Sequence, residues 1–231
     1  MSVAVVSSVY GGYDSIRNPV PQTVDCEFIM VTAEPVDSPP WRNVVEPRPR
    51  VHPRLASRIA KCNPWLYTDA DVTIWVDADI EINSPNFVQW CLDSLGDNVV
   101  CQWKQPDTDI NEELRVTRHF RKWDGDPIEQ QVALYNSEGY PEGRNTYWCG
   151  LIVRSKDFPQ EFGDEWLAEM VRWSCQDQIA YAHLTYKYGI EPALLPMAEY
   201  EQVCFFNVAG NGVPLGWRYE HYIRWVHSVA S

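Results

Sequence analysis

The run Val72–Val76 (VTIWV) leads directly into Asp77-Ala78-Asp79, and this junction constrains the fold more than any other part of the sequence. A short apolar run of this kind predicts a buried strand. Residues two apart on an extended backbone share a face, so Asp77 and Asp79 can point into one pocket where the strand ends. Because open α/β sheets bind ligands beyond the carboxyl ends of their strands, the junction predicts an α/β sheet with an acidic ligand pocket at its edge.

Strand-like and helix-like segments alternate along the rest of the chain. We expect further strands at residues 3–8, 26–32, 99–103, 148–154, 193–196 and 204–208. Apolar residues at helical spacing predict helices at residues 54–62, 87–95, 128–139 and 161–188, the last of them broken near residues 174–176. We expect an irregular loop in the proline-rich stretch 35–53, a charged, mixed segment at 106–127, and an aromatic, basic tail at 216–227 that docks on the body. The alternation predicts a single-domain α/β fold with a specialised second half.

Composition limits the class of protein. Of the 231 residues, 45% are hydrophobic and 22% are charged, which is typical of a soluble globular domain and excludes a disordered, collagen-like or coiled-coil chain. The formal net charge of −13 disfavours general binding to nucleic acid or to an anionic membrane. A local basic pocket for phosphate, or a divalent metal bound by clustered carboxylates, stays compatible with that charge.

Cysteine usage predicts a reducing compartment. Seven cysteines are scattered along the chain with no CxxC pair, so we expect small, reduced core residues rather than a disulfide framework or a zinc cluster. The N-terminus lacks the basic n-region of a secretory signal, and no window approaches the roughly 18 apolar residues of a membrane span. We therefore expect a cytoplasmic protein without a membrane anchor.

The two aspartates Asp77 and Asp79 form a DxD motif, which is a candidate metal site. Mg²⁺ and Mn²⁺ prefer hard oxygen ligands and often keep substrate phosphate in their coordination shell. The alternative is a strand followed by an acidic turn. The apolar run that leads straight into the motif favours the metal site.

Two other segments fit the same pocket. In the turn Tyr10-Gly11-Gly12-Tyr13-Asp14, glycines let the backbone approach a ligand, a tyrosine can stack on a base, and Asp14 can accept from a base N–H or a ribose hydroxyl. The helix expected at 54–62 places Arg54, Arg58 and Lys61 on one stripe, where they offer cations for a diphosphate. The alternatives are a plain tight turn and a solvated basic face.

Five segments, taken in order, resemble the glycosyltransferase-like domain of plant mucilage-related and turgor-related proteins. They are VYGGYDSI with Pro19, the Arg58–Lys61 helix with Pro64, IWVDADIEI, EQQVALYNSEGYP, and Trp148–Arg154 followed by SCQDQIAYAH. The resemblance spans roughly residues 3 to 183. It implies a GT-A-like, Rossmann-like fold, with a nucleotide-sugar-binding half at about 1–104 and an acceptor half with a closing segment at 105–231.

The same resemblance implies roles for individual residues. On the donor side these are Tyr10, Gly11 and Asp14 for the base and ribose, Arg58 and Lys61 for the diphosphate, and Asp77 and Asp79 for the metal and nucleotide. On the sugar and acceptor side they are Gln130, Glu138 and Trp148, with the catalytic pair Asp177-Gln178 near the anomeric carbon. Family members tend to have arginine before that pair, where this chain has Gln176, so the preference for a donor sugar stays open.

Asp177 has three candidate roles. In an inverting enzyme it would be the general base that deprotonates the acceptor hydroxyl. In a retaining enzyme it would stabilise an oxocarbenium-like centre or form a transient covalent adduct. A structural alternative is a helix N-cap, because IAYAHLTYKY follows directly and Asp favours that position.

Histidines complete the list of candidates. His221, in the aromatic tail near Arg224 and Trp225, is a candidate third metal ligand. His119 lies in the basic stretch RVTRHFRKW, which predicts contact with acceptor or phosphate. A packed or surface histidine is the alternative for the first, and a solvated helix face for the second.

The sequence therefore predicts a metal-dependent glycosyltransferase that uses a nucleotide-diphosphate sugar, in particular a UDP-sugar, with Mn²⁺ or Mg²⁺. One alternative is an inactive carbohydrate-binding or scaffolding protein of the same fold, which would not need Asp77, Asp79 or Asp177. Another is a metal-dependent phosphohydrolase, which normally uses more than one DxD and a histidine cluster. We expect a bacterial or phage source. The acceptor alternatives are a glycan, a small molecule, a protein or a modified nucleobase.

Overall fold

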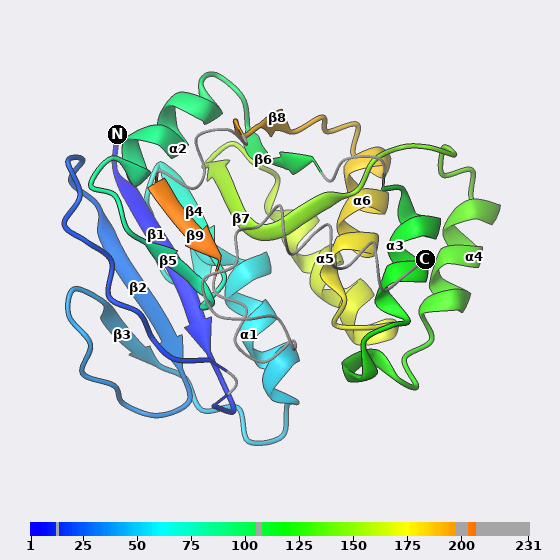
Figure 1. The fold of residues 1–231 in the computed structure, drawn as a ribbon, viewed down its shortest axis with the longest axis horizontal. Helices are drawn as coiled ribbons and strands as arrows, with labels where there is room; N and C mark the ends of the chain where they lie inside the picture. Colours follow the sequence, from blue (N-terminus) through cyan, green and yellow to red (C-terminus); the bar gives the residue numbers. More distant parts are fainter. Residues whose placement is uncertain (13, 105–107, 197–202, 207–231) are drawn as a thin grey trace.

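The computed structural model describes residues 1–12, 14–104, 108–196 and 203–206, and a mixed seven-stranded sheet forms its centre (Figure 1). The strand order is β3-β2-β1-β4-β7-β6-β8. In chain order the strands are β1 (Val3–Val9), β2 (Glu27–Thr32), β3 (Arg42–Val45), β4 (Val72–Val76), β6 (Val100–Lys104), β7 (Tyr147–Ser155) and β8 (Ala193–Leu194). Strands β1 to β4 are parallel, β7 is antiparallel to both β4 and β6, and β8 is parallel to β6. A separate antiparallel pair joins β5 (Ile80–Ile82) to β9 (Cys204–Phe206).

Helices cover both faces of the sheet because its central strands are apolar on both sides. On one face α1 (Pro53–Cys62), α5 (Gln160–Arg172) and α6 (Asp177–Lys187) pack against Ala4, Val6 and Trp75. On the other face α2 (Phe87–Leu95) packs against Val5, Ile74 and the β5–β9 pair. Successive residues of β1 thus enter opposite cores, as the strand period of two requires.

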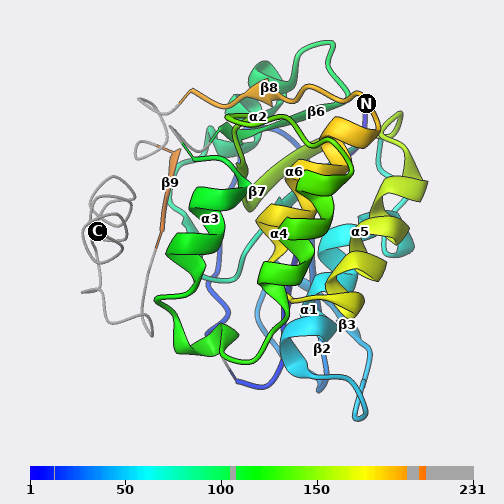
Figure 2. The same cartoon turned by 90° about the vertical axis from the view of Figure 1, so that its right-hand side faces the viewer.

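A third cluster extends the molecule beyond the sheet. It joins α3 (Ile110–Thr117), the short helix η2 (Arg121–Trp123) and α4 (Ile128–Ser137) to the outer side of α6. Figure 1 shows the parallel strands on the left and these helices on the right, and Figure 2 shows α3, α4 and α6 next to one another. The remaining short helix, η1 (Pro64–Leu66), follows α1.

The strand β7 joins the two halves of the chain. It comes from the second half, yet it lies between β4 and β6 from the first half. Its register with β4 runs from Val72↔Ser155 to Val76↔Leu151, so its beginning lies beside the carboxyl end of β4. Residues near the start of β7 can therefore fix the backbone that follows β4.

The α/β fold, with a mixed sheet flanked by helices, is confirmed, while three segments differ from the prediction. Residues 42–45 form β3 within the stretch expected to be an irregular loop, because this proline-free piece pairs with β2 at the sheet edge. The charged segment contains α3, whose N-terminus is capped by Asp109 accepting from the amides of Asn111 and Glu112. Strand β5, which follows the DxD motif directly, was not expected. The tail 216–227 and the last two residues of the strand expected at 204–208 lie outside the described residues.

The cysteines and the helices bear on two other expectations. All seven cysteines are described, none forms a disulfide, and five are buried. No helix within the described ranges combines the length and apolar content needed to cross a membrane.

Gly163 lets α5 approach the C-terminal end of α1 closely. A Cβ atom built at this position would lie 2.2 Å from Asn63 Oδ1 and 2.4 Å from the backbone oxygen of Cys62. Neither contact is permitted, and the second involves backbone that cannot easily move. The glycine is therefore required by packing, and the end of α1 that it contacts carries Lys61.

We predict that Gly163→Ala destabilises the fold. A Gly-to-Ala change in an open helix stabilises it by up to about 1 kcal/mol. Here overpacking should reverse the sign and cost about 1–3 kcal/mol in the free energy of unfolding. Urea unfolding followed by circular dichroism measures the change, with the exposed α5 variant Glu161→Ala as control. A Gly163→Ala variant as stable as wild type would contradict the close packing of α5 on α1.

Candidate functional site

Four carboxylates gather where β1 and β4 end and α6 begins. Asp14 follows the turn after β1, Asp77 and Asp79 follow β4, and Asp177 is the first residue of α6. The turn after β1 contains Gly11 and Gly12 at φ +68° and +66°, a conformation that glycine adopts without strain. The amide of Asp77 donates to the carbonyl of Gly150 on β7 at 2.8 Å, which fixes the start of the DxD segment.

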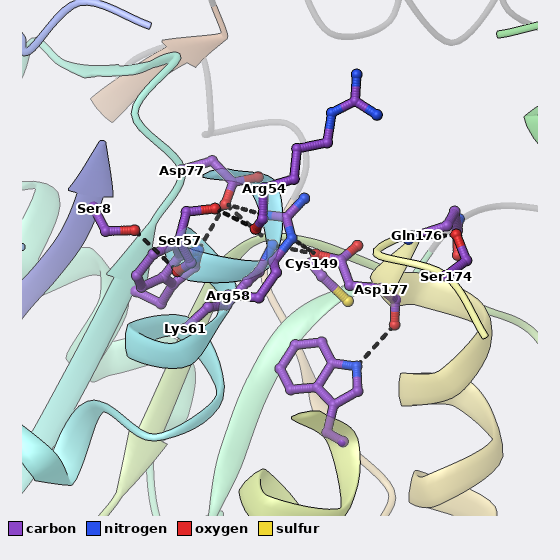
Figure 3. Close-up of polar contacts among 12 residues, drawn as sticks. Ser8, Arg54, Ser57, Arg58, Lys61, Asp77, Cys149, Ser174, Gln176 and Asp177 are labelled. Carbon is purple, nitrogen blue, oxygen red and sulfur yellow. Dashed lines mark hydrogen bonds and ion pairs between the residues drawn. The ribbon is translucent and has the colours of Figure 1, made fainter. Parts of the chain in front are cut away.

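Two cations of α1 bridge these carboxylates (Figure 3). Lys61, only 1% exposed, places Nζ 3.1 Å from Asp77 Oδ1 and 2.5 Å from Asp177 Oδ2. Arg58 lies one turn earlier on α1. Its Nη1 atom is 3.6 Å from Asp77 Oδ1, and its Nε atom is 3.4 Å from Asp177 Oδ2. The indole N–H of Trp75 adds a third donor to Asp77 Oδ1, at 2.8 Å. The buried ammonium group of Lys61 thus contacts Asp177, which lies 116 positions later in the sequence.

The cations keep Asp177 ionised although it is buried. Burial alone would raise the pKa of Asp177, but Arg58 and Lys61 outweigh it, so the pKa lies below its ordinary value. For Arg58 the signs are reversed. Burial lowers its pKa, but the charges of Asp177 and Asp77 outweigh burial, so the pKa of Arg58 lies above its ordinary value. The site therefore contains a buried, charged pair of cations between two carboxylates.

The N-cap of α6 is Gln176, not Asp177. The side-chain oxygen of Gln176 accepts from the amide of Ile179 at 3.1 Å, and its side-chain nitrogen donates to Glu113 on α3 at 2.7 Å. Asp177 is instead the first helical residue, and its backbone carbonyl accepts from the indole of Trp166 at 2.9 Å. Gln176 thus caps α6 and ties it to α3, which leaves the Asp177 carboxylate for Lys61 and Arg58.

Asp79 fits a cation that the described residues do not supply. Its Oδ1 atom is buried and accepts no hydrogen bond from the described residues. Burial, then Asp77 and Asp14, raise its pKa well above the ordinary value. Asp77 is less available, since Lys61 and Trp75 already donate to its Oδ1.

A divalent metal at this position would therefore need ligands from its substrate. In the described part of the chain, no group of three or more His, Cys, Asp or Glu side chains is placed to hold a metal ion. The predicted third ligand, His221, lies outside the described residues. Mg²⁺ is commonly held by one or two carboxylates plus waters and substrate phosphates, and the Asp77–Asp79 pair fits that mode.

Two cations of the site were not identified from the sequence. Arg17 donates to the carbonyl of Ala78 at 2.6 Å, between the two aspartates of the DxD motif. The charges of Arg17 and Lys122 both lower the pKa of Asp14, although burial and Asp77 raise it overall. The sequence gives no signal for Arg17, and it marks Lys122 only as part of the basic stretch RVTRHFRKW, because tertiary structure alone brings the two residues to the carboxylates.

Two aromatic residues predicted to contact substrate lie in the cores. Tyr10 is 6% exposed, and its hydroxyl donates to the carbonyl of Glu46 at 2.9 Å. Trp148 is 7% exposed, with its ring centroid 4.9 Å from that of Trp103. Both rings therefore contact protein rather than an open pocket.

The other predicted acceptor residues lie on the surface, on α4 or just after the ends of α3 and α4. Gln130, Glu138 and His119 are exposed, and Glu138 lies 3.7 Å from His183 on α6. Gln178, partly buried, follows Asp177 in the first turn of α6. The structure thus brings together Asp14, Arg58, Lys61, Asp77, Asp79 and Asp177 from the predicted set.

Comparison with known proteins identifies no family. No family model matches the chain, and no curated protein matches it. Among solved structures, the chain is similar to the bifunctional glycosyltransferase WbbM (TM-score 0.48, 14% identity), covering 99% of this chain and 44% of WbbM. It is also similar to the galactosyltransferase LgtC in complex with donor and acceptor sugar analogues (TM-score 0.42, 12% identity), covering 80% of this chain and 69% of LgtC. The chain spans less than half the length of WbbM, and likenesses this distant assign neither residues nor activity.

We predict that Asp79→Asn stabilises the metal-free protein at neutral pH. The folded state keeps a proton on Asp79 to a higher pH than the unfolded chain does, so this group costs stability as pH rises above about 4. Asparagine carries no charge, so the variant should gain about 1 kcal/mol over wild type by pH 7 and little at pH 4.

Urea unfolding between pH 4 and 7, in the presence of a chelator, measures this difference. Asp77→Asn is the matched control and should lose stability at pH 7, because Lys61 and Arg58 lose a charged partner. If Asp79→Asn is less stable than wild type at pH 7, the Asp79 carboxylate is satisfied within the protein and the cation site is wrong.

Proposed function

We propose that this chain is a GT-A-type glycosyltransferase that transfers a sugar from a nucleoside-diphosphate sugar, specifically a UDP-sugar, to a hydroxyl acceptor. The observation that carries the proposal is the arrangement of Lys61 and Arg58 between Asp77 and Asp177, at the carboxyl edge of the parallel strands. In open α/β sheets this edge is where ligands bind. We assign residues 1–104 to donor binding and residues 105–231 to acceptor binding.

The cations support an anionic donor. The chain has a net charge of −13, yet Arg17, Arg58 and Lys61 converge on the DxD segment. Departure of a nucleoside diphosphate develops negative charge, and fixed cations in a site of low dielectric stabilise it. Asp77 and Asp79 would hold Mn²⁺ or Mg²⁺, which would supply further positive charge at the leaving phosphate.

The state of Asp177 favours one of its candidate roles. A general base works best when its pKa lies near the working pH, whereas Lys61 and Arg58 hold the pKa of Asp177 below its ordinary value. An ionised carboxylate can instead stabilise positive charge at the anomeric carbon as the bond to the diphosphate breaks. We therefore assign Asp177 to this electrostatic role, which predicts retention of anomeric configuration.

Nucleotide binding tests the proposal directly. UDP, GDP, CDP and ADP would be screened by thermal shift and calorimetry, each with and without Mn²⁺. We expect UDP with Mn²⁺ to raise the melting temperature, because a ligand at 100 times its Kd adds about 2.7 kcal/mol to stability. For a chain of this size each kcal/mol of stability raises the melting temperature by about 2–4 °C, so we expect a shift of several degrees.

Two variants distinguish the site from a general metal effect. Asp79→Ala should abolish the Mn²⁺-dependent shift, whereas Asp157→Ala, an exposed aspartate in the turn after β7, should keep it. No binding of any of the four nucleotides at millimolar concentration with Mn²⁺ would sink the transferase proposal. Binding without sugar transfer or donor hydrolysis would favour the inactive binding protein.

A further inference from the structure

The short helix η2 presents Lys122 beside α1. Arg54 of α1 donates from Nη1 to the backbone carbonyl of Lys122 at 2.5 Å, and its guanidinium lies 5.2 Å from the ring centroid of Trp123. Lys122 Nζ lies 5.1 Å from the same ring and 5.6 Å from the ring of Phe120. Figure 3 shows Arg54 extending away from Arg58, so the basic stripe of α1 reaches from Lys61 toward η2.

The backbone of this turn is held on three sides. Arg118 donates to the carbonyls of Trp123 at 3.1 Å and Asp126 at 2.8 Å, and it forms an ion pair with Glu129 of α4. The carboxylate of Asp126 accepts from the Ser174 hydroxyl at 2.6 Å, just before α6. With Arg54 on the α1 side, these bonds place Lys122 before any ligand arrives.

Lys122 differs from Arg115 and Arg118 in its partners. Arg115 pairs with Glu112 on the surface of α3, and Arg118 pairs with Glu129, so both are engaged within the protein. In contrast, Lys122 forms no ion pair with any carboxylate of the described residues, and its side chain is exposed to solvent. Arg121, in the same turn, also has no ion pair within the described residues, but Lys122 is the cation of this turn whose charge acts on Asp14 and Asp79.

Its electrostatic surroundings point to an anion. Although Lys122 is exposed as a whole residue, its ammonium group is surrounded by protein, and this burial, then Arg58 and Arg54, lower its pKa, while Asp79 and Asp177 act in the opposite direction. Three cations, Lys122, Arg54 and Arg58, therefore lie near enough to repel one another beside the DxD segment. Such repulsion is relieved by a ligand that brings concentrated negative charge, and a diphosphate does so.

We propose that Lys122 is a phosphate ligand that, together with Arg58, binds the diphosphate of the donor nucleotide. The inference rests on the proposed function and extends it to the second half of the chain. It also gives donor binding a consequence, because the turn that carries Lys122 is bonded through Asp126 and Ser174 to the segment before Asp177. A bound diphosphate would thereby hold η2, α1 and the start of α6 together.

Calorimetric titration of the full chain tests the proposal with three probes: UDP, uridine and inorganic pyrophosphate, each with Mn²⁺ at 0.15 M salt. We expect Lys122→Gln to weaken binding of UDP and pyrophosphate by about tenfold or more, since a charge-assisted hydrogen bond is lost. Binding of uridine should not change, and Lys122→Arg should recover most of the affinity for UDP.

Arg121→Gln is the matched control. It removes the same charge from an exposed neighbour in the same turn and should leave UDP affinity within about twofold, because screened surface charges act weakly at this salt.

Three outcomes would overturn the assignment. If wild type binds pyrophosphate, and Lys122→Gln binds pyrophosphate and UDP as tightly as wild type does, the role of Lys122 is wrong while the proposed function stands. A loss of turnover with unchanged UDP affinity would place Lys122 at an acceptor phosphate and would also overturn the assignment. If wild type binds neither pyrophosphate nor any nucleoside diphosphate, the proposed function itself fails and this inference fails with it.

Discussion

The buried ammonium of Lys61 is the interaction on which the rest of the structure depends. Removing an ammonium group from water is costly unless carboxylates are held against it, and Asp77 and Asp177 contact Lys61, which is 1% exposed, from the two halves of the chain. The backbone carbonyl of Lys61 in turn accepts from Arg154 on β7 at 2.7 Å. Arg154 is itself 2% exposed and places its positive charge at the negative end of α1. These contacts fix the relative positions of α1, β4, β7 and α6. Separating the elements would leave a charged side chain without its partner in the core.

This constraint explains why the proposed donor site lies where the two halves of the chain meet. Strand β7 enters the sheet between β4 and β6, and Gly150 at its start fixes the amide of Asp77. Helix α6 begins beside that point because Gln176 caps it and Trp166 holds the carbonyl of Asp177. A donor bound at the DxD segment would therefore contact groups from both halves at once. The same charges that join the two halves also provide an ionised carboxylate and two cations in a partly buried site.

The sequence predicted those parts of the site that depend on local periodicity. The apolar run Val72–Val76 predicted the strand before the DxD motif, and helical spacing placed Arg58 and Lys61 on one stripe of α1. Arg17 could not be predicted and Lys122 was predicted only as part of the basic stretch around His119, since each reaches the carboxylates only through tertiary contacts. Local propensity also made Asp177 a candidate cap of α6, where the structure has Gln176, because Asp and Gln side chains can both accept from the first-turn amides. For Tyr10 and Trp148, composition does not distinguish a ring that stacks on substrate from one that fills a core.

A double-mutant cycle between Lys61 and Asp177 tests the central claim most directly. Urea unfolding at pH 7 would compare wild type with Lys61→Met, Asp177→Asn and the double variant. Breaking a buried pair from one side typically costs about 3–5 kcal/mol, and we predict that the double variant loses at least about 1 kcal/mol less than the sum of the single losses. The ion pair keeps the pKa of Asp177 low. Its contribution to the free energy of unfolding is therefore present at pH 7 and is lost as the pH falls through the pKa of Asp177 in the folded state. The difference between wild type and Lys61→Met should narrow accordingly. Additive losses that do not change with pH would contradict the account.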